Sequence, residues 1–288
     1  MRVARTSAEI RRQLKPLRAG KTIAFVPTMG CLHEGHLSLI KKARSAADIV
    51  VVSIYVNPLQ FGPNEDLDKY PRTYDADSRL CADAGVDFIF HPETLYPANG
   101  PKVTLKAEKL SDCLCGASRP GHFDGVVTVV NILFNIVQPD IAIFGEKDWQ
   151  QLAIIRRMVS DLQMPIEIIG AETVREADGL AKSSRNRYLS DAERAYAVAV
   201  SQALLAMQKL AESGETDIEA LKNEANSILL AAGIAAEYLD IRNPVSLKNK
   251  RKLNQQPARA FIAARVGETR LIDNMPVLTG HANTEESL

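Results

Sequence analysis

The segment Asp48–Val56, which reads DIVVVSIYV, constrains the fold of this chain more than any other feature. Apart from Asp48 and Ser53 it is apolar and rich in β-branched residues, with no alternation of polar and apolar positions. A strand that is buried on both faces has this composition, because neither row of its side chains meets water. Such strands belong to parallel sheets that helices cover on both sides, so the sequence predicts an α/β domain.

The rest of the first half alternates short apolar runs with helical patterns. This alternation is typical of a parallel sheet with helices on both faces, and ligands bind beyond the carboxyl ends of the strands in such sheets. We expect further strands at Ile23–Pro27, Val86–Phe90, Ile141–Phe144 and Ile166–Gly170, and helices at Leu37–Ala47, Tyr74–Gly85, Gly125–Val137 and Asp148–Asp161.

The pattern changes after about Thr173, where two helices rich in Ala and Leu precede three strand-like runs. Helices followed by an antiparallel set of strands predict a second, smaller α+β domain. We therefore expect one domain over residues 1–174 and another over 175–288. The helices of the second domain are predicted at Asp191–Glu212 and Ile218–Ala232, and its strands at Ala236–Arg242, Ala258–Val266 and Thr269–Asp273.

The composition argues against several classes of protein. The 288 residues include 35 Lys and Arg against 35 Asp and Glu, so neither a nucleic acid nor an anionic membrane is expected as a partner. The first ten residues lack the apolar core of a signal peptide, and the longest apolar stretch is too short to span a bilayer. We expect a cytoplasmic location with reduced cysteines. Cys113 and Cys115 lack zinc-site spacing, which favours a chance pair over a metal site.

The most informative motif is PTMGCLHEGH, at positions 27–36. A strand ends there, a turn containing glycine follows, and a helix is expected to start near His36. The N-terminus of a helix favours anions, and imidazoles beside it can donate hydrogen bonds to phosphate oxygens. His33 and His36 are three positions apart, so a helical turn would place them on one side of the helix. The zinc-protease motif requires two histidines that are four positions apart, so this segment does not match it. A pair of surface histidines at a helix cap is the less attractive alternative.

Three other segments each have a plain structural alternative. Gly145–Asp148 ends another predicted strand, so Asp148 could simply cap the next helix while Lys147 could pair with a phosphate. Lys182–Arg187, which reads KSSRNR, offers hydroxyl and guanidinium donors but could be a solvated basic loop. Asn57–Gly62, which reads NPLQFG, offers neutral amides but could be only a turn.

Taken together, five segments in this order resemble the pantoate–β-alanine ligase (pantothenate synthetase) family of the HIGH-motif nucleotidylyltransferases. The resemblance runs from Phe25 to Asp273. The segments are PTMGCLHEGH, YVNPLQFGPNEDLDKYPRT, RPGHFDGVVTVV, FGEKDWQQL and VREADGLAKSSRNRYLS.

The resemblance implies a Rossmann-like doubly wound domain and a smaller C-terminal lid domain that carries the KSSR loop. It implies that ATP and (R)-pantoate form an enzyme-bound pantoyl adenylate and diphosphate. β-Alanine then attacks the adenylate and releases pantothenate and AMP. ATP with Mg²⁺ is the expected co-substrate, no protein ligand of the metal is assigned, and a homodimer is expected.

The resemblance also implies residue roles. His36 matches the family's proton donor and His33 a neighbour that contacts phosphate. Gln60 matches a residue that touches both pantoate and β-alanine, and Gln151 a second pantoate ligand. The ATP site is expected to contain Met29, Gly30, Cys31, Leu32, His33, Glu34, Gly35, His36, Gly145, Glu146, Lys147, Asp148, Val174, Lys182, Ser183, Ser184 and Arg185. The catalytic donors among these are His33, His36, Lys147, Ser183, Ser184 and Arg185, and the pantoate pocket adds Pro27, Thr28, Asn57 and His122.

Two positions depart from the family pattern. Cys31 stands where a small residue is common, and Lys182 stands where Met or Leu is usual. The contact made by the Lys182 ammonium is left open. Three other functions also remain open at this point: a nucleotide-coenzyme adenylyltransferase of the same superfamily, a fragment of an aminoacyl-tRNA synthetase, and a nucleotide-binding sensor without catalysis.

Overall fold

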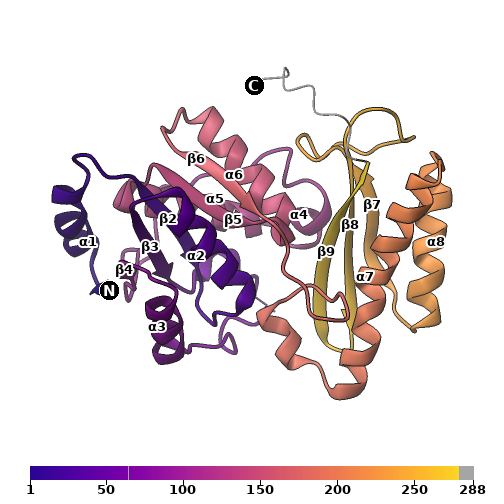
Figure 1. Ribbon diagram of the computed structural model, residues 1–288, viewed down its shortest axis with the longest axis horizontal. Helices are drawn as coiled ribbons and strands as arrows, with labels where there is room; N and C mark the ends of the chain where they lie inside the picture. Colours follow the sequence, from indigo (N-terminus) through magenta and orange to yellow (C-terminus); the bar gives the residue numbers. More distant parts are fainter. Residues whose placement is uncertain (64, 279–288) are drawn as a thin grey trace. The chain divides into compact units, whose positions relative to one another are not determined.

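The computed structural model describes residues 1–63 and 65–278 (Figure 1). Contacts within the chain divide it into two compact units. The first unit comprises Met1–Asp112, Gly116–Glu146 and Ile154–Glu172, and the second comprises Cys113–Cys115, Lys147–Ala153 and Thr173–Leu288, of which 279–288 lie outside the described residues. The domain boundary expected after residue 174 stays a prediction.

The first unit is built on a parallel sheet with the strand order β1-β4-β3-β2-β5-β6 in the described part of the chain. The order reverses direction at β2, which pairs with β3 on one side and β5 on the other. The carboxyl ends of β2 and β5 therefore form the topological switch point at which doubly wound sheets bind ligands. The strands are β1 Arg2–Ala4, β2 Ile23–Thr28, β3 Ile49–Ile54, β4 Phe88–Phe90, β5 Ile141–Gly145 and β6 Glu167–Ala171.

Helices cover both faces of this sheet, which confirms the doubly wound α/β prediction. On one face, Ala24 and Val26 of β2 share a core cluster with Leu39 and Ile40 of α2. On the other face, Phe25 packs edge-on against Phe134 of α5, with ring centroids 6.3 Å apart. The α-helices are α1 Ser7–Leu14, α2 Glu34–Ala46, α3 Tyr74–Asp83, α4 Leu114–Ser118, α5 His122–Val137 and α6 Trp149–Asp161; the 3₁₀ turns are η1 Lys15–Leu17, η2 Pro58–Gln60 and η3 Glu146–Asp148.

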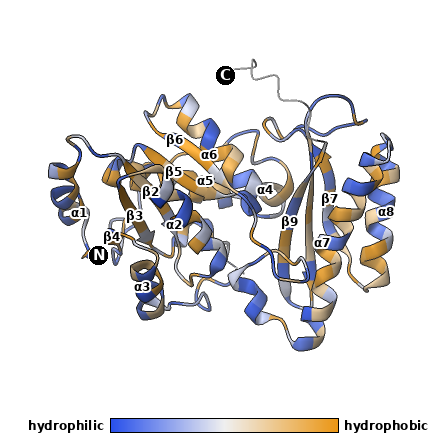
Figure 2. Ribbon diagram, viewed as in Figure 1, coloured by the Kyte–Doolittle hydropathy of each residue, from blue (hydrophilic) through white to orange (hydrophobic). Residues whose placement is uncertain are grey.

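The second unit contains an antiparallel sheet of order β7-β8-β9 in its described residues, with α7 and α8 packed against it (Figure 1). This arrangement confirms the predicted small α+β part. In Figure 2, α7 and α8 carry both hydrophobic and hydrophilic residues, as amphipathic helices do. The elements are η4 Ser184–Tyr188, α7 Asp191–Glu212, α8 Ile218–Ala231, β7 Ala236–Arg242, β8 Ala258–Val266 and β9 Thr269–Leu278.

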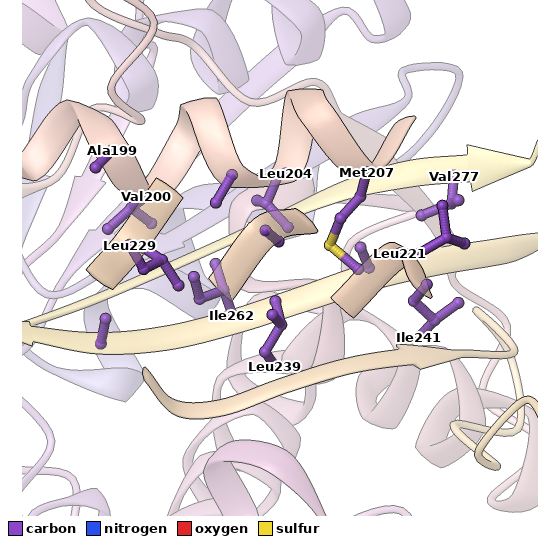
Figure 3. Close-up of a cluster of buried hydrophobic side chains, with 14 of the residues drawn as sticks. Ala199, Val200, Leu204, Met207, Leu221, Leu229, Leu239, Ile241, Ile262 and Val277 are labelled. Carbon is purple, nitrogen blue, oxygen red and sulfur yellow. The ribbon is translucent and has the colours of Figure 1, made fainter. Parts of the chain in front are cut away.

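The core of the second unit lies between these helices and the sheet (Figure 3). Leu204 and Met207 of α7 are fully buried there, beside Leu221 of α8 and Ile262 of β8. Burying each such side chain stabilises the fold by about 1.5–3 kcal/mol. Leu271 and Val277 of β9 belong to the same core, which therefore helps to fix this strand. Among the described helices, none is both long enough and apolar enough to cross a bilayer.

Candidate active site

The turn after β2 is held by a carboxylate that lies far away in the sequence. Asp77 of α3 is only 1% exposed, and its two oxygens accept the N–H groups of Cys31 (2.9 Å) and Leu32 (2.8 Å). The hydroxyl of Thr73 also donates to this carboxylate, at 3.1 Å. A buried carboxylate with these donors fixes the course of the backbone between β2 and α2.

The backbone of this turn explains its glycine and its cysteine. Gly30 has φ of +83°, and a Cβ there would lie 3.0 Å from an oxygen of Asp77, so only glycine fits. Cys31 also has a positive φ, of 53°, which few residues with a side chain adopt. The hydrogen bonds from Cys31 and Leu32 to Asp77 offset the free-energy cost of this conformation. Backbone strain held in this way is typical of functional turns.

The two imidazoles of the motif form a capping box at the start of α2. The N–H of Gly35 donates to Nδ1 of His33 (3.1 Å), and the N–H of His33 donates to Nδ1 of His36 (3.3 Å). Both Nδ1 atoms accept, so each neutral ring carries its proton on Nε2, which is a hydrogen-bond donor. The ring centroids lie 4.2 Å apart, so the structure brings the two rings together as their spacing predicted. The helix starts at Glu34, before the expected His36, because His33 serves as the N-cap.

Gly35 leaves room for the ring of His33. A Cβ at position 35 would lie 2.8 Å from Cε1 and 2.9 Å from Nδ1 of that ring. A glycine in such a turn can let a ligand approach the backbone closely. In this structure the imidazole of His33 occupies the space beside it.

Asn57 orients the amide of Gln60. Asn57 is 1% exposed, and its Nδ2 donates to Oε1 of Gln60 (3.0 Å) and to the carbonyl of Gly125 (3.1 Å). Its Oδ1 accepts from the hydroxyl of Tyr96 (2.6 Å) and from the N–H of Leu59 (3.3 Å). Burial, followed by the effect of a neighbouring tyrosine, raises the pKa of Tyr96, so the hydroxyl stays a donor. Because Oε1 accepts from Asn57, the orientation of the Gln60 amide is fixed, and Nε2 is its hydrogen-bond donor.

His122 is held by groups of the protein on both sides of its ring. Nδ1 lies 2.8 Å from the carbonyl of Gln60, which can only accept, and Nε2 lies 3.0 Å from the guanidinium of Arg119, which can only donate. Arg119 in turn pairs with both carboxylate oxygens of Glu65, at 2.7 and 2.6 Å. Burial opposes the ionisation of Glu65, but the bonds to Arg119 outweigh it and its pKa is lowered. His122 therefore supports the backbone of Gln60.

The segment after β5 leads into α6. Lys147 is half-buried, and its ammonium lies 3.8 Å from the carboxylate of Asp148, which is too far for a short ion pair. Gln150 is 5% exposed; its Nε2 donates to the carbonyl of Cys113 (2.8 Å) and its Oε1 accepts from the N–H of Cys115 (3.0 Å). Of the two adjacent glutamines, Gln150 is thus structural, whereas the predicted pantoate ligand Gln151 is only half-buried.

The KSSR segment follows a short hairpin over residues 174–182. The N–H of Lys182 donates to the carbonyl of Val174 (2.9 Å), and the ammonium of Lys182 pairs with Glu176 at 2.9 Å. Ser183 caps η4, because its side chain accepts from the N–H of Arg185. In the structure the ammonium of Lys182 thus contacts a carboxylate of the same hairpin, and its role toward ATP stays a prediction.

The predicted site residues are distributed over both units. The first unit brings together His33 and His36, and separately Asn57, Gln60 and His122. Residues expected to bind ATP or pantoate that belong to the second unit are Lys147, Asp148, Gln151, Val174, Lys182, Ser183, Ser184 and Arg185. Within residues 1–63 and 65–278, no group of three or more His, Cys, Asp or Glu side chains could hold a metal ion.

The sequence interpretation missed the residues that support this site. Asp77 is a charged residue on the same face of α3 as the buried Cys81, four positions later, and that mismatch was its one visible signal. Tyr96 and Glu65 gave none, because their partners Asn57 and Arg119 lie 39 and 54 positions away in the sequence.

Comparison with known proteins identifies the family. A family model described as pantoate–β-alanine ligase matches residues 2–276. The pantothenate synthetase of Marinobacter nauticus is 52% identical over 283 residues, covering 96% of this chain and 99% of the relative. That of Pseudomonas putida is 51% identical over 280 residues, covering 96% and 97%.

Solved structures agree with this result. The pantothenate synthetase of Thermus thermophilus has a TM-score of 0.92 and 45% identity, covering 97% of this chain and 100% of that one. The pantoate–β-alanine ligase of Francisella tularensis, solved in complex with β,γ ATP and β-alanine, has a TM-score of 0.80 and 36% identity, covering 97% and 99%. The chain therefore belongs to the pantoate–β-alanine ligase family.

Proposed function

We propose that this chain condenses (R)-pantoate with β-alanine to give pantothenate, AMP and diphosphate through an enzyme-bound pantoyl adenylate. Membership of the ligase family supports the overall condensation, and the complex of the Francisella tularensis relative supports ATP and β-alanine as substrates. The switch-point position of the histidine turn supports a nucleotide site on the first unit.

The observation that carries this proposal is the capping box of His33 and His36. Attack of the pantoate carboxylate on the α-phosphorus moves negative charge onto phosphate oxygens and the leaving diphosphate. Two neutral imidazoles with the proton on Nε2 are donors for that charge at a helix N-terminus. Because the backbone fixes both rings, little reorganisation is needed when the charge develops.

Pantoate is bound by neutral amides. Asn57 occupies Oε1 of Gln60, so Nε2 of Gln60 donates to the pantoate carboxylate. An amide orients a carboxylate without neutralising it, and the carboxylate stays nucleophilic. Gln151 acts as the second pantoate ligand, with Pro27 and Thr28 beside the pocket, while Asn57 and His122 set the position of Gln60.

The donors of the second unit act on the nucleotide. Lys147, Ser183, Ser184 and Arg185 stabilise the phosphates and the departing diphosphate. Mg²⁺ enters with ATP as part of the substrate. Such a metal would be held mainly by the substrate phosphates, as Mg²⁺ usually is in nucleotide sites. In the second step the amine of β-alanine attacks the acyl carbon of the adenylate, and AMP leaves with the electron pair of the broken acyl–phosphate bond.

The decisive experiment is exchange of labelled diphosphate into ATP. Exchange should require pantoate, because pantoate is the acceptor of the adenylyl group. It should proceed without β-alanine, because adenylate formation is reversible and is then the only step that can occur. An adenylyltransferase that acts on a nucleotide coenzyme would not need pantoate, and a sensor without catalysis would show no exchange. Either of those results would reject the proposed reaction.

We also propose a cytoplasmic homodimer. Light scattering coupled to gel filtration tests the assembly, with a mass near 63 kDa expected for two copies of the 31.6 kDa chain. A mass equal to one chain across the micromolar range would reject the dimer. Fractionation of cells that express a tagged chain tests the location.

A further inference from the structure

Two neighbouring residues on β9, Asp273 and Asn274, contact the hairpin before the KSSR segment and the backbone at Lys147, respectively. Asp273 and Asn274 are 4% and 3% exposed, although both are polar. They pair with Ile262 and Phe261 of β8, and side chains of successive strand residues point to opposite faces. One dipeptide can therefore hold one segment on each side of the sheet.

Asp273 holds the hairpin that precedes the KSSR segment. Its two carboxylate oxygens accept from the guanidinium of Arg175 at 2.7 and 3.0 Å. The same guanidinium donates to the carbonyl of Gly179, at 3.0 Å, on the other side of the hairpin turn. Arg175 thus closes the hairpin from inside while Asp273 fixes the guanidinium, and Lys182 and Ser183 follow directly along the chain.

Asn274 holds the backbone at Lys147. Its Nδ2 donates to the carbonyl of Lys147 at 2.8 Å, and its Oδ1 accepts from Arg259. The guanidinium of Arg259 lies 3.4 Å from the ring centroid of Trp149, two residues after Lys147. The backbone N–H of Asn274 also donates to the carboxylate of Asp273, at 2.7 Å, so the backbone of one residue holds the side chain of the other.

We propose that Asp273 and Asn274 are positioning residues for adenylation, because together they fix Lys147 relative to the KSSR segment. This inference rests on the proposed function, in which Lys147 and Ser183–Arg185 bind phosphates of ATP. Neither β9 residue needs to touch substrate. Their effect comes from keeping Lys147 at a fixed distance from the donors of Ser183–Arg185. Displacement of catalytic groups by about 1 Å can lower the rate on the order of 10²-fold.

The test uses Asp273→Asn and, as a matched control, Asp240→Asn. Asp240 of β7 also pairs with an arginine, Arg242, at 2.7 Å on the same sheet, but its contacts do not include either nucleotide segment. The assay is pantoate-dependent exchange of diphosphate into ATP, with KM measured separately for ATP and for pantoate. We expect Asp273→Asn to raise the KM for ATP about tenfold or more and to lower kcat, with the pantoate KM within about twofold.

A second variant covers the case in which Asp273→Asn does not fold. Arg175→Lys keeps the charge but loses the two-pronged geometry, and it should raise the ATP KM in the same way. ATP and pantoate KM values within about twofold of wild type in the folded variants would overturn the proposal, as would the same ATP effect in Asp240→Asn. Absence of exchange in the wild-type chain would instead reject the proposed function.

Discussion

The hydrogen bonds of Asp77 lead to a quantitative prediction for Asp77→Asn. The carboxylate accepts the N–H of Leu32 on one oxygen and the N–H of Cys31 on the other. An asparagine has only one oxygen, so in either orientation its amide group faces one of these backbone donors. That donor is then buried without an acceptor, because this position is 1% exposed.

The expected loss of stability follows from these contacts. Loss of a hydrogen bond to a charged acceptor, with its donor left buried, costs about 2–3 kcal/mol. For a chain of this size that corresponds to a melting temperature lowered by roughly 4–10 °C. The catalytic effect should be larger, because the turn that loses its anchor leads directly to His33. We expect pantoate-dependent diphosphate exchange to fall about 10²-fold.

Asp87→Asn is the matched control for this prediction. Asp87 also accepts a backbone N–H, that of Val50 at 2.8 Å, and a charged donor, Arg44, at 2.6 Å. It lies at the amino ends of the strands, away from the histidine turn. The Asp87→Asn variant should have a lower melting temperature, while its rate of diphosphate exchange stays within about twofold of the wild-type rate. The role of Asp77 in anchoring the histidine turn is wrong if Asp77→Asn has the melting temperature and exchange rate of the wild type. It is also wrong if Asp87→Asn loses as much exchange activity as Asp77→Asn.

Three further substitutions test the rest of the site. His36→Ala should lower exchange by about 10²–10³-fold with the fold retained, and a rate within a few-fold of wild type would reject its role. Gly35→Ala should displace the ring of His33, because Cε1 of that ring would lie 2.8 Å from the new Cβ. The rate of exchange should therefore fall at least about tenfold, while the circular dichroism spectrum stays unchanged. Tyr96→Phe removes the 2.6 Å bond to Asn57 and should raise the pantoate KM several-fold with the ATP KM constant. Equal changes in both KM values would contradict the role of Tyr96 in orienting Asn57 and, through it, Gln60.

The sheet strands could be predicted from the sequence because their signal is local. Runs such as Ile49–Ile54 are apolar on both faces apart from Ser53, and the turns between elements carry glycine or proline. β9 was predicted too short, since the expected strand ended at Asp273 and the observed one contains Asn274 and Pro276 and ends at Leu278. β9 is an edge strand, where a proline is tolerated, so pairing continues to Leu278.

The local geometry of the histidine turn could be predicted only in part. The spacing of His33 and His36 placed the rings together, but the start of the helix was missed because histidine is not a usual N-cap residue. The anchors could not be predicted, since Asp77 and Asp273 find their partners 46 and 98 positions away. A motif therefore marks candidate ligand-binding groups, whereas the residues that hold those groups emerge only from the folded chain.

The bond between Lys147 and Asn274 has a consequence for biosynthesis. The two residues are 127 positions apart, so at 5–20 residues per second the ribosome adds Asn274 roughly 6–25 s after Lys147. The nascent chain can assemble the parallel sheet during that interval, whereas the backbone at Lys147 must wait for the last strand. Under the proposed positioning role, full adenylation activity therefore follows the synthesis of β9.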